Sequence, residues 1–168
     1  MFYRVRQFYQ AFFPQITSKD LLLVHSFLPE AAVPLFKSQS LADQRHALDV
    51  AFDLKHIPNN QNLNQNRNLI IAALLHDCGK TCYPLKIWQR VYIVLCARLP
   101  KNIQEFLLDL DYLRPFSMPL RLASEHPYWG ADLAYEAGLN DEVVQLIRRH
   151  HTPHSDLEKL LYWADNRH

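Results

Sequence analysis

An adjacent histidine and aspartate, His76 and Asp77, stand directly after the apolar run 69–75. The run is apolar on every face, which predicts a helix buried at the centre of the fold. Two polar groups at the end of a buried helix are costly unless something satisfies both of them. A divalent cation does so directly, because a carboxylate can bridge two ions while an imidazole binds one. The pair therefore predicts a metal site.

Two adjacent residues cannot surround an ion, so further ligands must come from other helices. The candidates share nitrogen or oxygen donors and a position at the edge or end of a predicted helix: His46, His126, His150, His151 and Asp165. Nine histidines among 168 residues raise the expectation of a metal further. We expect one of His150 and His151 to bind metal and the other to support it, and which one binds stays open.

The ordered set H…HD…H…H…D resembles the HD superfamily of metal-dependent phosphohydrolases. Residues 74–80, LLHDCGK, are similar to the HDIGK signature of its HDIG branch, with Cys78 in place of isoleucine. Residues 125–131, EHPYWGA, resemble the HPxxGA helix of that branch. His150-His151-Thr152 and the stretch 157–165, LEKLLYWAD, resemble the late motifs of bacterial diadenosine tetraphosphate hydrolases.

The resemblance implies an all-α protein, a single-domain HD-type helical bundle with a central metal site. It implies two divalent metal ions, often iron or manganese, with zinc, nickel, cobalt or magnesium as alternatives. The implied ligands of the first ion are His46, His76, Asp77 and Asp165. Asp77 would bridge to a second ion, which His126 would hold together with His150, His151 or both.

Asp77 and Lys80 are the catalytic residues that the resemblance implies, acting with a water that the metals activate for attack on phosphorus. Lys80 and an arginine such as Arg45 or Arg149 are candidate contacts to the substrate phosphate, because charge-assisted hydrogen bonds suit that role. We expect a small phosphorylated substrate, a nucleotide or a related phosphoester. Phosphomonoesterase, phosphodiesterase and dinucleoside polyphosphate hydrolase activity all stay open.

A rival hypothesis is a regulatory HD module that keeps the metal site and senses a nucleotide without hydrolysing it. The intact ligand set favours the enzyme. Two features of the HD-GYP branch, which cleaves cyclic dinucleotides, are missing. Ala42 stands where that branch carries a glutamate, and residues 152–155, TPHS, replace its GYP segment.

Helical spacing of apolar residues, with Pro, Asn and Gly between segments, predicts the elements that position these residues. We expect helices over 2–13, over 18–28 after a cap at Thr17 or Ser18, and over 41–55 after a cap at Ser40. Residues 58–66 are predicted to form a surface loop. Gly79 suits the left-handed position after a helix, which would place His76 and Asp77 in the last turn of the buried helix.

Further helices are expected over 85–99 and 101–110. Pro115 and Pro119 predict a break before a helix over 126–137, which Gly138 would end. The last two helices are expected over 141–151, capped by Asn140 or Asp141, and over 155–166. We expect a helical extension, residues 1–40, packed on an HD domain of residues 41–168.

Composition limits the class of protein. Eighteen Lys and Arg against seventeen Asp and Glu give a net charge of +1, which argues against a partner that is a nucleic acid polymer. No apolar run approaches the roughly 18 residues of a transmembrane segment. Three cysteines without metal-binding spacing favour a reduced, cytoplasmic compartment. A homodimer stays open.

Overall fold

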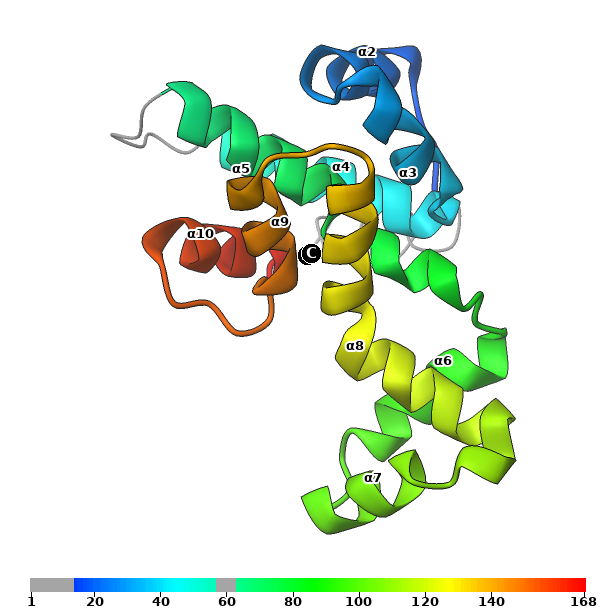
Figure 1. The fold of residues 1–168 in the computed structure, drawn as a ribbon. Coiled ribbons are helices and arrows are strands. Elements are labelled where there is room, and N and C mark those ends of the chain that lie inside the picture. Colours follow the sequence, from blue (N-terminus) through cyan, green and yellow to red (C-terminus); the bar gives the residue numbers. More distant parts are fainter. Residues whose placement is uncertain (1–13, 57–62) are drawn as a thin grey trace, which may run out of the picture.

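The computed structural model describes residues 14–56 and 63–168, and every regular element within those ranges is helical, as predicted. The expected helix over 2–13 lies outside the described residues. The helices are α2 (Ser18–Phe27), η1 (Glu30–Ala32), α3 (Val33–Ser38), α4 (Leu41–His56), α5 (Leu63–Leu75), η2 (Cys78–Cys82), α6 (Ile87–Cys96), α7 (Lys101–Leu108), η3 (Asp111–Leu113), α8 (Arg114–Glu136), α9 (Asp141–Arg148) and α10 (Asp156–Asp165) (Figure 1).

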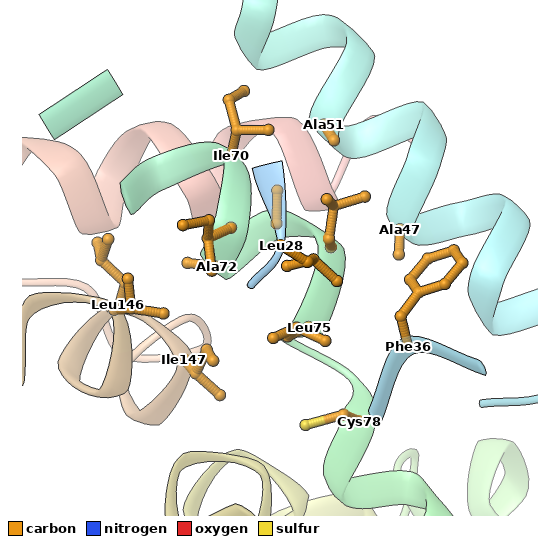
Figure 2. Packing of buried hydrophobic residues seen from close by; sticks show 14 of the residues in the cluster. Leu28, Phe36, Ala47, Ala51, Ile70, Ala72, Leu75, Cys78, Leu146 and Ile147 are labelled. Carbon is orange, nitrogen blue, oxygen red and sulfur yellow. The ribbon is translucent and has the colours of Figure 1, made fainter. Parts of the chain in front are cut away.

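The core surrounds α5, whose residues 69–75 are all at most 5% exposed. Figure 2 shows side chains of α5, among them Ile70 and Leu75, between those of α4 and those of α9. The residues labelled on α9 are Leu146 and Ile147. The prediction of a buried central helix is confirmed. Leu28 and Phe36, which precede residue 41, belong to the same core. The division at residue 40 into extension and HD domain stays a prediction.

Side-chain caps begin several helices where the sequence predicts them. Thr17 caps α2 by accepting from the Asp20 backbone N–H at 3.2 Å, and Ser40 accepts from Asp43 at 3.2 Å at the start of α4. Asn140 accepts from the Val143 N–H at 3.0 Å at the start of α9. Each cap satisfies a backbone donor that the first helical turn leaves unpaired.

The predicted role of Gly79 is wrong. Within the described residues, Gly138 after α8 is the only glycine with a positive φ, 76°, whereas Gly79 lies inside η2. Helix α5 ends at Leu75, so His76 and Asp77 follow it instead of forming its last turn. Gly79 is small because α8 passes over it: an added Cβ would lie 2.0 Å from the His126 carbonyl oxygen and 2.6 Å from the Gly130 nitrogen.

The predicted break at Pro115 and Pro119 is also wrong, because both prolines belong to the continuous helix α8. Pro115 lies in its first turn, where a missing N–H costs nothing. Pro119 leaves the Pro115 carbonyl without its helical donor. The buried Gln89 of α6 supplies that donor, with Nε2 at 3.0 Å from the oxygen. A contact from another helix therefore allows α8 to begin twelve residues before the predicted start at 126.

The predicted loop over 58–66 is wrong at its end, since α5 begins at Leu63. Residues 57–62 lie outside the described part of the chain. Among the described helices, none has the length and apolar character needed to cross a bilayer.

Gly79→Ala is expected to lower the free energy of unfolding by about 3 kcal/mol, since overpacking against rigid backbone costs at the upper end of the usual range. Gly138→Ala is the matched control: an added Cβ has open space there, and only the positive φ is strained, which costs about 1 kcal/mol. Urea unfolding of both variants measures the difference. Equal losses would contradict the close approach of α8 to Gly79.

Candidate metal centre

Separate elements bring the predicted ligands to the centre of the fold. His76 and Asp77 follow α5, and His126 lies within α8. His150 and His151 follow the end of α9. His46 lies in α4, and Asp165 is the last residue of α10, which the capping box of Ser155 and Glu158 begins.

The first cluster consists of His46, His76 and Asp165, whose ligand atoms all lie within 4.8 Å of one another. Nε2 of His46 is 2.8 Å from Oδ1 of Asp165, and Nε2 of His76 is 3.4 Å from the same oxygen. His76 is fully buried, while the His46 and Asp165 side chains are 25% and 18% exposed. The cluster has two nitrogen donors and one carboxylate, a donor set typical of first-row transition metals.

The second cluster consists of His126, His150 and His151, also within 4.8 Å. Asp77 lies between the two clusters: Oδ1 is 3.2 Å from Nε2 of His126, and Oδ2 is 3.5 Å from Nε2 of His76. The two oxygens of one buried carboxylate thus face different clusters. This is the arrangement that a carboxylate bridging two cations requires.

The nitrogens of the buried imidazoles fit a bound cation. Nδ1 of His76, His126 and His150 lies 2.9, 2.9 and 2.7 Å from the carbonyl oxygens of Ala73, Leu122 and Ile147. A carbonyl only accepts, so each Nδ1 carries the proton and each Nε2 presents a lone pair. These three Nε2 atoms are buried and find no hydrogen-bond partner among the described residues. Inward-facing lone pairs of this kind are what a metal ion binds.

The charges of the site agree with that chemistry. Burial raises the pKa of Asp77, but His76 and Lys80 outweigh it and hold that pKa well below its usual range. Burial, followed by the neighbouring His76 and His151 rings, holds the pKa of His150 well below its usual range. Asp77 is therefore a carboxylate and His150 a neutral imidazole near neutral pH, the forms in which both bind metal.

The pKa of His76 shifts the other way. Burial lowers it, yet the carboxylates of Asp77 and Asp165 more than offset the burial and raise the pKa above its usual value. The same negative charge that favours a proton on His76 favours a cation between the three residues. Burial, with Asp77 beside it, raises the pKa of the Cys78 thiol to about 12, so this thiol stays protonated near neutral pH.

A cavity of about 550 Å³ opens beside the second cluster. His126, His151 and Lys80 line its inner end, and the Lys80 ammonium contacts Oδ2 of Asp77. The remaining walls combine hydroxyl, charged and apolar side chains: Ser38, Ser40, Asp43, Thr81, Pro84, Leu85, Arg90, Ile93, Leu122 and Ala123. The cavity offers a substrate both cations and apolar surface next to the predicted ligands.

The structure does not bring the two predicted arginines to this cavity. The Arg45 guanidinium lies 3.0 Å from Asp20 and 2.9 Å from Asp49, which ties α2 to α4. The Arg149 guanidinium contacts the side-chain amide of Gln145. Neither residue lines the cavity, whereas Arg90 of α6 does. Sequence reasoning missed Arg90, because the only signal was the basic character of its helix.

Mn²⁺ is expected to raise the Tm of the purified chain. A cation at a hundred times its Kd adds about 2.7 kcal/mol to the stability, which corresponds to roughly 5–10 °C for a domain of this size. A chelator should reverse the shift, and His126→Ala should reduce it. Asp156→Ala is the control, since that carboxylate is 95% exposed on α10. A full shift in His126→Ala, measured by differential scanning fluorimetry, would argue against this site.

Comparison with known proteins agrees with this geometry. The family model of the HD domain matches residues 44–168, which include every predicted ligand and the lining of the cavity from Lys80 onward. Neither a curated protein nor a solved structure matches the chain. The match covers most of the chain, and HD domains constitute a superfamily of metal-dependent phosphohydrolases. The chain therefore belongs to the HD-domain family.

Proposed function

We propose that the protein is a phosphohydrolase that acts on a nucleotide or related phosphoester at a centre of two divalent cations, iron or manganese. The observation that carries the proposal is the position of Asp77. Its two oxygens face the nitrogens of two separate clusters, at 3.2 and 3.5 Å, while its side chain is only 3% exposed. Nε2 of His76 and Nε2 of His126, the atoms that face these oxygens, are buried without a hydrogen-bond partner among the described residues, and a cation on each side would satisfy both them and the carboxylate.

In this proposal, His46, His76 and Asp165 hold one cation, and His126, His150 and His151 hold the other, with Asp77 common to both. The cations would activate a water and neutralise charge that develops on the phosphoryl oxygens. The task of the chain is orientation: the Nδ1 bonds to backbone carbonyls fix the rings, and burial excludes bulk water from the inner face of the site.

Lys80 is proposed to bind the substrate phosphate. Its side chain is 37% exposed, so the ammonium reaches the cavity while remaining beside Asp77. Burial lowers the pKa of Lys80, but Asp77 outweighs it and raises that pKa, so the side chain stays cationic. A cation at the border between the ligands and the cavity suits a phosphoryl oxygen as it gains charge.

The walls of the cavity support a nucleotide as the substrate class. Leu85, Ile93 and Leu122 provide apolar surface for a base, and Ser38 and Thr81 carry hydroxyls that can bond to a ribose. Arg90 adds a second cation to the lining, besides Lys80 and from another helix, α6. Two cations in one cavity suit a substrate that carries more than one phosphate.

Hydrolysis of nucleoside phosphates and of a chromogenic phosphodiester by the Mn²⁺-loaded protein tests the proposal. Asp77→Asn should abolish turnover and lower the bound metal, because the shared ligand is lost. Lys80→Met should retain the metal and reduce kcat about a hundredfold, the usual cost of removing one charged contact to the transition state. Lys159→Met is the control, since Lys159 is 60% exposed on α10 and does not line the cavity.

Two results would count against the enzyme. Stoichiometric metal without turnover of any phosphoester would favour the nucleotide-sensing module, and nucleotide binding by calorimetry would then establish that function. Turnover that survives in Asp77→Asn would mean that a contaminating phosphatase, and not this site, acts on the substrate.

Arg90→Gln should raise KM about tenfold for nucleoside triphosphates and leave KM for the monophosphates nearly unchanged. The physical reason is the loss of a charged hydrogen bond to a distal phosphate, worth about 1.5–3 kcal/mol. Arg148→Gln is the control, because Arg148 pairs with Asp132 on the surface at 2.9 Å. An equal rise in KM for mono- and triphosphates would show that Arg90 supports the cavity wall and does not contact phosphate.

A further inference from the structure

The arm formed by residues 86–121 contains α6, α7, η3 and the first turns of α8. Figure 1 shows α7 at the opposite end of the molecule from α2, beyond the helices that surround α5. Nineteen large hydrophobic side chains are exposed in the described part of the chain, and eleven of them lie in this arm. Scattered exposed apolar residues are normal in proteins, but such a concentration marks an interaction surface.

The exposed apolar residues of α6 form one face. Ile87, Val91, Val94 and Leu95 follow helical spacing and are 84%, 55%, 57% and 58% exposed. The side of α6 toward α8 is held by Gln89, which is 3% exposed and bonds to the Pro115 carbonyl. The packing of α6 against α8 through Gln89 therefore leaves the apolar face of α6 exposed to solvent.

Helix α7 extends the same surface. None of its residues is buried, although Ile103 and Phe106 are large and apolar, with exposed fractions of 40% and 63%. A helix of eight residues is not stable in water by itself and usually depends on packing of an apolar face. Helix α7 packs on α8, but this contact leaves Ile103 and Phe106 exposed.

Charge identifies the partner. The arm carries six Lys and Arg (Lys86, Arg90, Arg98, Lys101, Arg114 and Arg121) against three acidic residues. The rest of the chain carries twelve basic against fourteen acidic residues, so positive charge is concentrated where apolar side chains are exposed. Five of the six cations are exposed, among them Arg90 of the cavity wall, and Arg98 follows the end of α6, four residues after Val94.

A second copy of the chain fits this surface poorly. A two-fold dimer would press the arm against itself and oppose its like charges. An anionic lipid surface matches both properties, because basic side chains bind the headgroups while apolar side chains enter the acyl boundary. Trp88 and Tyr112, which are 44% and 79% exposed, are residue types that favour this boundary.

We propose that the arm docks the protein on the surface of an anionic phospholipid bilayer, with the outward faces of α6 and α7 lying in the interface. The helices would lie along the bilayer, since no described helix can cross it. This proposal does not depend on the chemistry proposed for the metal centre. None of the predicted metal ligands belongs to residues 86–121.

Flotation of the full chain with vesicles tests the proposal. Vesicles of phosphatidylcholine mixed with phosphatidylglycerol should bind the protein, vesicles of phosphatidylcholine alone should not, and high salt should release it. The double variant Val94→Glu, Leu95→Glu should lose binding. Leu22→Glu is the matched control, because Leu22 is 70% exposed on α2, outside the arm. This variant should bind the vesicles like the wild type.

The single variants Arg98→Gln and Lys101→Gln provide a second test if the double variant fails to fold. Each should weaken binding to anionic vesicles about fivefold, the factor expected for one basic residue near a charged membrane. Absent binding to anionic vesicles, or equal binding to neutral ones, would overturn the proposal. So would a wild-type dimer in sedimentation equilibrium that Val94→Glu, Leu95→Glu dissociates, because a second copy would then cover the arm.

Discussion

The withdrawal of imidazole nitrogens and a carboxylate from water is the constraint on which this fold depends. His76, Asp77, His126 and His150 are at most 3% exposed, and a buried polar group without a partner costs roughly 1–3 kcal/mol. Each buried ring satisfies one nitrogen through a carbonyl three or four residues earlier in its own segment. The local backbone therefore sets the orientation of each ring. The Nε2 atom of each ring remains available to bind a group at the centre of the site.

Convergence of these rings requires helices to approach more closely than ordinary side chains allow. The backbone of η2 meets that of α8 at Gly79 and Gly130, where the nitrogen of Gly79 would lie 3.1 Å from a Cβ on Gly130. This approach places His126 within 3.2 Å of Asp77. A side chain at Gly79 would push α8 away and move His126 from Asp77. The small residues near the HD pair are thus part of the site, although they carry no chemistry.

The sequence predicts the features that local chemistry determines. Side-chain type predicts the cap at Ser40 and narrows two others to Thr17 or Ser18 and to Asn140 or Asp141, of which Thr17 and Asn140 form the caps, and an all-apolar run predicts the buried centre. The identity of the metal ligands stays a prediction, although the structure gathers their donor atoms into two clusters.

Features that depend on a distant partner could not be predicted. The continuity of α8 through Pro119 depends on a donor from Gln89, thirty residues earlier, and a rule based on proline alone gives a break. The ion pair of Arg45 is a comparable case, because nothing near Arg45 in the sequence indicates that its guanidinium binds Asp20 of another helix. Arg90 carries no motif, and only the packing of α6 places it in the cavity wall.

Helix α6 connects the two proposals through its geometry. Arg90 and Ile93, three residues apart, face the cavity, whereas Val91, Val94 and Leu95 form the exposed apolar face. Arg90 and Val94 are neighbours on the helix surface, so the cavity wall and the exposed apolar face border each other on α6, which Gln89 holds to α8. In the proposal, a bilayer against the apolar face would border the residues of α6 that line the cavity. The buried Gln89 contact holds both Arg90 and the proposed docking face in place relative to α8.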